Sequence, residues 1–144
     1  MTNLLFEQHQ TILKAANELL RAVQRSPRPA MDELSRLRMR LSSEIRHHRH
    51  SEEELVFAPL KTQGGFEKLP QAKIAYAEIQ QEKNCYSANI ALWTPQRIMA
   101  DWNGYRLSLQ ERINKLHLMI RKEEDQVYRP IWALVGTPGQ PAAA

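Results

Sequence analysis

Apolar residues recur every three or four positions along most of the chain, which is the spacing of amphipathic helices. Residues 3–24 form the first such segment, and the string SPRP ends it. A second segment starts near Met31, with Asp32 as its expected N-cap, and runs to Pro59. After the turn sequence KTQGGFEKLP, residues 71–93 form a third. We therefore expect three helices joined by short connections in this part of the chain.

The last part of the chain begins with a break at Thr94 and Pro95, which suit a helix cap and a first helical position. A short helical stretch leads through Asp101 into a fourth long helix. No strand pattern competes with these helices, so the sequence predicts an all-α fold, an antiparallel up-down-up-down four-helix bundle with a short extra helical segment before the last helix. We expect the bundle to cover residues 1–135 and residues 136–144 to form a mobile tail.

Composition narrows the classes of protein to consider. A chain of 144 residues, 42% hydrophobic and 25% charged, fits one globular domain. The opening MTNLLFEQHQ predicts neither a signal peptide nor a membrane span, and a single cysteine, Cys85, suits a reducing compartment, so we expect a cytoplasmic protein. The net charge of +4 is spread over strings that interleave both signs, as in RKEED. We therefore expect no nucleic-acid partner and no membrane partner.

Aromatic residues gather near the ends of the later segments. We expect them to plug one end of the bundle, and an exposed cluster of this kind would alternatively serve a homodimer. The residues are Trp93, Trp102, Trp132 and Tyr105.

Every predicted helix also carries polar side chains on its inward stripe, where an unpaired polar group is costly. His9 lies at the centre of the first stripe. In the second helix, His48 and Glu52 are four residues apart on the inward line, so their side chains can converge. In the third, Glu78 follows the line of Ile74, with Gln81 and Glu82 beside it. In the fourth, Glu123 and Glu124 lie on either side of the apolar line and His117 on its flank.

This combination of residues favours a metal site. A single inward histidine is more often a satisfied core residue than a ligand, but several carboxylates facing each other in a dry core repel unless a multivalent cation compensates them. Imidazole and carboxylate ligands from facing helices hold paired iron or manganese ions in helical bundles. With many oxygen donors and no set of thiolates, zinc is disfavoured. The residues therefore predict a non-haem site for iron or manganese.

Three strings of the chain resemble motifs of the hemerythrin-like, or HHE cation-binding, domain family. They are EQHQTI around His9, HRHSEEELVFAPL from His48, and IRKEEDQVYRPIW from Ile120. The last two strings echo each other, since Glu52, Glu53, Phe57 and Pro59 recur at the spacing of Glu123, Glu124, Tyr128 and Pro130. The resemblance spans nearly the whole chain and implies a four-helix bundle with a centre of two non-haem iron ions, manganese being the less favoured metal.

The chain also departs from the family pattern. Met119 stands where a histidine precedes the fourth-helix glutamate, and the third helix offers Glu78, Gln81 and Glu82 in place of histidines. Each proline motif has one extra residue before the proline, which leaves open whether Glu52 or Glu53, and Glu123 or Glu124, faces inward. A site this rich in carboxylate would hold ferric iron firmly and favour oxygen or peroxide chemistry over reversible oxygen carriage.

The expected ligands are His9, His48, Glu52, Glu78 and Glu123, with Glu82, His117 and Glu124 as substitutes or outer residues. The leading hypothesis is a di-iron protein that senses or handles oxygen, nitric oxide, peroxide or iron and signals through a regulatory protein partner. Two alternatives stay open. One is a di-iron peroxidase or oxidase, and the other is a metal-free bundle that serves as an interaction module.

Overall fold

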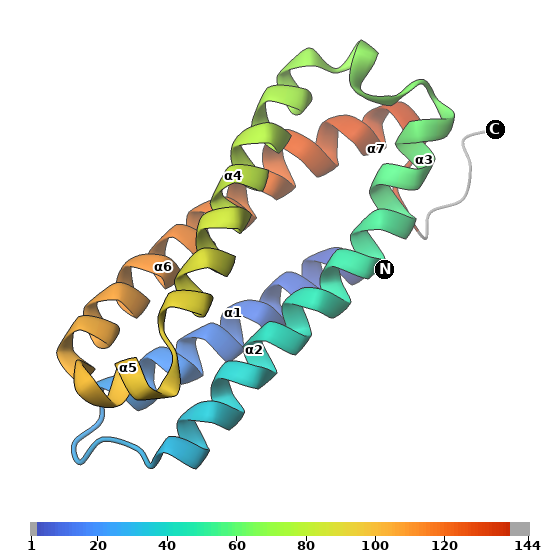
Figure 1. The fold of residues 1–144 in the computed structure, drawn as a ribbon. Coiled ribbons are helices and arrows are strands. Elements are labelled where there is room, and N and C mark those ends of the chain that lie inside the picture. Colours follow the sequence, from blue (N-terminus) through green and yellow to red (C-terminus); the bar gives the residue numbers. More distant parts are fainter. Residues whose placement is uncertain (1–2, 139–144) are drawn as a thin grey trace.

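The computed structural model describes residues 3–138, and four long helices in it run antiparallel as a bundle (Figure 1). They are α1 (Leu4–Gln24), α2 (Met31–Glu52), α4 (Pro70–Leu92) and α6 (Trp102–Glu123). The short helix α5 (Pro95–Ala100) precedes the last of them. Helix α1 packs against α2 and α6, and α4 packs against α6. The all-α bundle and its extra segment are thus confirmed, whereas most of the expected tail, from residue 139 onward, lies outside the described residues.

Helices α2 and α6 both continue through a π-helical turn into a short α-helix. In α2 the turn is η1 (Glu53–Phe57) followed by α3 (Ala58–Thr62), and in α6 it is η3 (Glu124–Tyr128) followed by α7 (Arg129–Val135). A π-turn holds one residue more than an α-turn. The extra residue in each proline motif is accommodated there, so that Glu52 and Glu123 face inward while Glu53 is exposed. A 3₁₀ turn, η2 (Gly65–Lys68), connects α3 to α4.

Side-chain caps fix the starts of three helices. Asn3 accepts hydrogen bonds from the first backbone N–H groups of α1, and Thr94 and Asp101 do the same for α5 and α6. A Cβ on Gly104 would lie 2.1 Å from the Asp101 carboxylate, so a larger residue there would displace the capping side chain. The expectation for Asp32 was wrong, because α2 begins at Met31 after Ala30 and Asp32 lies within its first turn.

The apolar core is divided into two clusters. The larger contains Ile12, Leu41 and Ile113, and the smaller contains Leu5, Val56 and Ile131. Six polar or charged side chains of the described residues are buried as well: Gln8, His9, His48, Ser51, Glu52 and Glu123. None of the described helices is long and apolar enough to cross a membrane.

The tryptophans do not share one end of the bundle. Trp93 and Trp102 both pack against Tyr105 at the α5 end, as expected. Trp132 instead packs against Phe6 and Tyr128 in the other apolar cluster. The expectation of a single aromatic plug was therefore wrong for Trp132.

Helix α4 faces the core with a different side from the one expected. The predicted inward line began at Ile74 and Glu78, but Ile74 is 55% exposed and Glu78 is exposed. The buried residues are Ala72, Ala75 and Ile79. Apolar residues occur on several sides of this helix, so their spacing alone does not fix its orientation.

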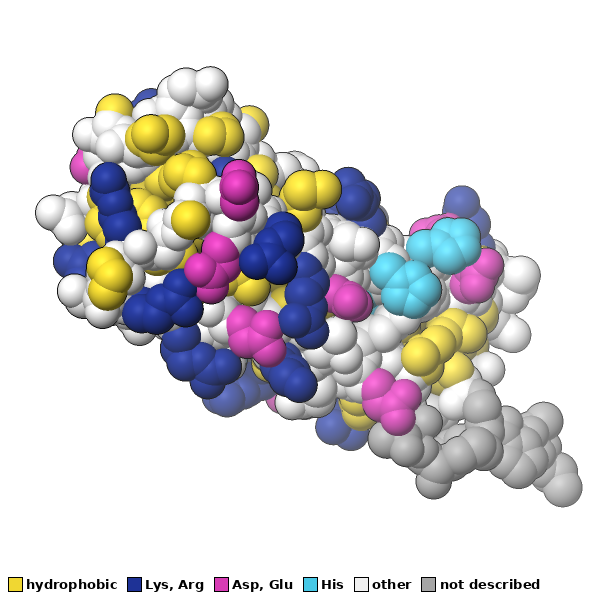
Figure 2. All heavy atoms as spheres, turned by 90° about the horizontal axis from the view of Figure 1, so that it is seen from below, with side chains coloured by type: hydrophobic (Ala, Val, Ile, Leu, Met, Phe, Trp, Pro, Cys, Tyr) yellow, Lys and Arg dark blue, Asp and Glu magenta, His cyan; other side chains and the backbone are white. Residues whose placement is uncertain are grey.

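On the surface drawn in Figure 2, Lys and Arg side chains are interspersed with Asp and Glu side chains. The charges are therefore as dispersed on this face as they are along the sequence. The same face also shows apolar side chains grouped toward one end of the molecule.

Candidate metal centre

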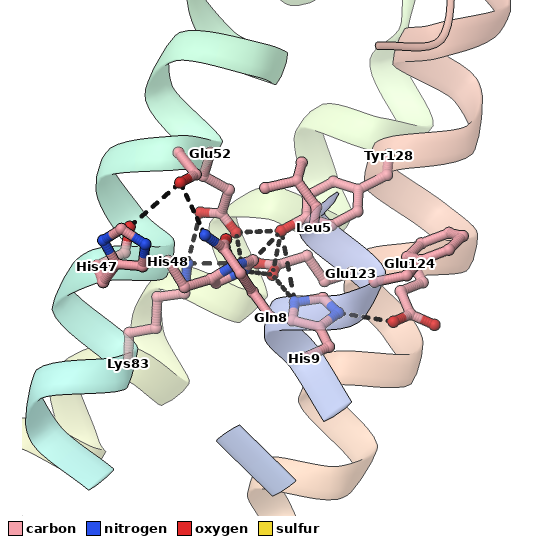
Figure 3. Close-up of polar contacts among 12 residues, drawn as sticks. Leu5, Gln8, His9, His47, His48, Glu52, Lys83, Glu123, Glu124 and Tyr128 are labelled. Atoms are coloured by element: carbon pink, nitrogen blue, oxygen red, sulfur yellow. Dashed lines mark hydrogen bonds and ion pairs between the residues drawn. The ribbon is translucent and has the colours of Figure 1, made fainter. Parts of the chain in front are cut away.

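Four polar side chains from three helices converge inside the bundle (Figure 3). His9 comes from α1, His48 and Glu52 from α2, and Glu123 from α6, and all four are buried. One candidate ligand atom of each lies within 4.8 Å of those of the other three. Ligands bonded to one metal ion at about 2.1 Å lie at most about 4.2 Å apart. A small contraction would therefore bring all four atoms onto a single ion.

Both imidazole rings are oriented by hydrogen bonds on the side away from the cluster. Nδ1 of His9 donates to Glu124 Oε2 at 2.6 Å, and Nδ1 of His48 donates to Gln8 Oε1 at 2.8 Å. The Gln8 amide in turn donates to Ser51 Oγ at 2.9 Å. With the proton on Nδ1, the Nε2 lone pair of each ring faces the centre, as a metal-ligating histidine requires.

Each Nε2 atom faces a carboxylate oxygen at close range. His9 Nε2 lies 3.1 Å from Glu123 Oε1, and His48 Nε2 lies 3.1 Å from Glu52 Oε2. A lone pair and a carboxylate repel, so these contacts are favourable only with a proton or a metal ion between the two atoms. Burial opposes a charged imidazolium, but hydrogen bonds with Glu123 and Glu52 and their negative charges outweigh it and raise the pKa of His48. The site is thus built to attract positive charge.

The hydroxyl of Tyr128 lies in the middle of the four side chains. It is 2.7 Å from Glu123 Oε1 and 3.0 Å from His48 Nε2, and it also contacts Glu52 Oε2. Its ring stacks on His9, with centroids 5.5 Å apart. Burial, together with the charges of the two glutamates, raises the pKa of Tyr128, so the phenol is neutral and donates a hydrogen bond to a carboxylate.

Lys83 reaches the same cluster from α4, the remaining long helix of the bundle. Its Nζ lies 3.3 Å from Glu52 Oε1 and 3.2 Å from Glu123 Oε2. Burial disfavours the ammonium form, but the charges of Glu123 and Glu52 outweigh it and raise the pKa of Lys83. Burial would raise the pKa of Glu123, but its close contacts with His48 and His9 and the charge of Lys83 outweigh burial and hold this pKa well below its usual value. The two carboxylates therefore favour the ammonium form of Lys83.

The donor set suits a hard or borderline metal ion. Two imidazoles, two carboxylates and a phenol are ligands typical of iron or manganese, and the cluster contains no thiolate. The buried Glu123 Oε2 accepts no hydrogen bond, although Lys83 lies near it. This oxygen is therefore still able to bind a cation. The residues therefore fit one bound metal ion.

Three other residues expected at the site lie outside it. Glu78 is exposed and pairs with Lys122, and Glu82 lines a surface cleft between α4 and α6 with that same pair. His117 Nε2 lies 3.2 Å from Asn17 Oδ1, at the contact between α6 and α1. Glu124 contacts the far side of the His9 ring, which is the outer position considered for it.

Sequence reasoning missed Gln8, Lys83 and Tyr128. Lys83 follows Ile79 by four residues on the buried side of α4, so the correct orientation of this helix would have pointed to it. Tyr128 follows Glu123 by five residues, a separation that shares one side of a helix only across a π-turn. The signal for Tyr128 cannot be recognised from a regular helical repeat, whereas that for Lys83 needs the correct inward face of α4.

A small cavity of about 30 Å³ adjoins the cluster. Its lining includes the polar residues His9, His48, Lys83 and Glu123 and the apolar residues Ile12, Ile45 and Met119. The space suits one small molecule. A separate open cleft between α2 and α4 reaches Glu52 and Lys83 from the surface.

Histidine and glutamate side chains that converge inside an antiparallel four-helix bundle define a class of helical metal-binding proteins. The chain belongs to the hemerythrin HHE cation binding domain family, whose model matches residues 1–131. No curated protein and no solved structure matches the chain at a significant level.

Proposed function

We propose that the protein is a non-haem iron protein in which His9, His48, Glu52 and Glu123 are the metal ligands. The observation that carries this proposal is the convergence of four buried ligand atoms within 4.8 Å, with both Nε2 atoms turned inward by partners on Nδ1. Iron bound there would supply redox chemistry and an open position for a small ligand. A pair of ions, as the family resemblance implies, would have to share this space with Lys83.

The ligand that we propose is a small molecule such as dioxygen, nitric oxide or peroxide. The 30 Å³ cavity beside the histidines has room for one such molecule, and Ile12, Ile45 and Met119 form an apolar part of its wall. An apolar wall favours an uncharged diatomic molecule over an ion. Tyr128 and Lys83 place hydrogen-bond donors at the cluster, where they would stabilise negative charge on a bound ligand.

Metal analysis of anaerobically purified protein tests the proposal. We expect bound iron, an optical spectrum that changes when nitric oxide is added, and loss of both in Glu52→Ala. The matched control is Glu53→Ala, which removes the neighbouring exposed carboxylate. A fully folded protein that takes up no iron, manganese or zinc at neutral pH would refute metal binding. Peroxide turnover by the iron-loaded protein, lost in Glu52→Ala, would instead favour the peroxidase or oxidase hypothesis.

A second candidate, a metal-free bundle, is favoured by the contacts of Lys83 and Tyr128. These two residues already place a cation and a hydroxyl donor against Glu52 and Glu123. The cluster can therefore remain folded without a metal. Equal thermal stability with and without chelator would support this candidate, because an ion that binds only the folded state must stabilise it.

A regulatory protein partner, or a second copy of the chain, would bind the protein according to whether the metal site carries its ligand. Helices α5 and α6 expose several large apolar side chains, which suit such a contact. They are Met99, Leu107 and Leu118. Molar mass from light scattering, measured with and without iron, tests the homodimer.

A further inference from the structure

Each carboxylate of the centre directs its two oxygens at different partners. For Glu52, Oε2 contacts Tyr128 and His48, while Oε1 contacts Lys83. For Glu123, Oε1 contacts Tyr128 and both histidines, while Oε2 lies beside Lys83. The two glutamates therefore span two positions that favour positive charge, and Figure 3 shows Lys83 reaching the cluster.

The two positions are lined differently. The first is surrounded by two imidazoles and a phenol, which are metal ligands. The second position lies on the α4 side of the same two carboxylates, and Lys83 is the residue of α4 that contacts them. The acidic residues of α4 give no help there, since Glu78 is exposed and paired with Lys122 and Glu82 lines an outer cleft. Among residues 3–138, the partner found for Glu52 Oε1 and Glu123 Oε2 is thus Lys83, while the exposed Glu53 lines the adjoining cleft without a hydrogen bond or ion pair to the centre.

We infer that the ammonium group of Lys83 takes the place of a second metal ion, so that Glu52 and Glu123 bridge one metal ion and one built-in cation. The part that concerns the metal ion rests on the proposed function. A second ion bonded to Glu52 Oε1 and Glu123 Oε2 at about 2.1 Å would overlap the space of Nζ, which lies 3.3 and 3.2 Å from those oxygens. It would also be repelled by the ammonium charge at short range.

The charges of the centre agree with a single ion. Glu52, Glu123 and Glu124 supply three negative charges and Lys83 one positive charge, so one divalent ion makes the group neutral. Two divalent ions with Lys83 in place would leave an excess of two positive charges in a buried site. An uncompensated buried charge is strongly unfavourable. The balance of charge therefore favours one bound divalent ion.

Metal stoichiometry tests the inference. The metal-free protein is titrated anaerobically with Mn²⁺ and Fe²⁺, bound metal per chain is measured after gel filtration, and Mn²⁺ is examined by electron paramagnetic resonance. We expect one ion per chain and the signal of an isolated Mn²⁺ for the natural protein and for Lys83→Arg, which keeps the cation. Lys83→Glu should bind two ions and show a coupled pair. The surface control, Lys122→Glu, should still bind one.

Two outcomes separate the inference from the proposed function. Two ions bound to the natural protein, or one ion bound to Lys83→Glu, would overturn the inference and leave metal binding intact. No bound ion in the natural protein would overturn the proposed function.

The role of the ammonium group is then decided in the metal-free protein. We expect Lys83→Met to lower its melting temperature by ~10 °C and the double variant with Glu52→Gln to recover most of the loss, because the buried negative charge is removed as well. Additive effects of the two substitutions would overturn the inference, as would a melting temperature unchanged by Lys83→Met.

Discussion

Tyr128 donates a hydrogen bond to the carboxylate of Glu123 at 2.7 Å, although the two residues are five positions apart along the same helix. At 3.6 residues per turn, an α-helix would point these two side chains in different directions. The π-turn η3 begins at Glu124, directly after the glutamate, and brings them together. In the parallel position of the other helix, Phe57 has no hydroxyl and packs against Tyr76 and Phe66. The central hydroxyl therefore comes from one π-turn only.

We predict that Tyr128→Phe destabilises the metal-free protein by about 1–3 kcal/mol, because Glu52 and Glu123 lose a buried donor. Iron-loaded protein should lose less, since the ion compensates the same carboxylates. Urea unfolding with and without bound metal measures both values. Tyr105→Phe, a buried tyrosine in the other apolar cluster, is the control. An equal loss with and without metal would contradict a role for this hydroxyl in the centre.

We also predict that the hydrogen bond from His9 to Glu124 supports metal affinity. Removing the partner of a metal-bound histidine typically weakens metal binding ten- to a hundredfold. Glu124→Ala should therefore raise the dissociation constant for Mn²⁺ by about that factor, as measured by calorimetry. Glu53→Ala is the matched control, because Glu53 has the corresponding position in the α2 motif and is exposed. If both variants weaken Mn²⁺ binding equally, the loss results from the change in net charge and not from the hydrogen bond to His9.

The π-turns lead to a prediction about deletions. Turn η1 accommodates one residue beyond the α-helical repeat, so deleting the exposed Glu54 should convert it into an α-turn and leave both flanking segments in register. We expect the bundle to stay folded, with its melting temperature changed by only a few degrees. Deleting the exposed Ser43 in the middle of α2 should unfold the protein, because it rotates every later side chain by ~100°. Circular dichroism measures the helix content of both deletion variants. A similar loss of helix in the two would mean that η1 holds no surplus residue.

The four helices were predictable because their apolar repeats are long and their separators contain proline and glycine. His9, His48 and Glu52 were placed correctly on inward faces for a related reason, since each lies between aliphatic residues of a strong stripe. The side chain of Glu123 could not be told from that of Glu124 by counting, because the π-turn begins between them.

The orientation of α4 could not be predicted, and for this reason the contribution of α4 to the centre was missed. Small residues, Ala72 and Ala75, form its buried face, while the larger Ile74 is exposed, so hydrophobicity alone favoured the wrong side. Lys83 was also unexpected because a lysine inside a bundle is stable only beside opposite charges, and those come from helices far away in the sequence.

The final prediction concerns the cavity beside the histidines. Ile45 lines it without being a ligand, so Ile45→Phe should fill the space and weaken nitric oxide binding to the iron-loaded protein by about tenfold or more, equivalent to about 1.4 kcal/mol. Iron content should stay unchanged, because the cluster is left intact. Ile45→Leu, which nearly conserves volume, should bind nitric oxide as the natural protein does. Optical titration under anaerobic conditions measures the affinity. Unchanged binding in Ile45→Phe, with iron bound and the bundle folded, would mean that the ligand reaches the ion from another side, and the cleft at Glu52 and Lys83 then offers the route.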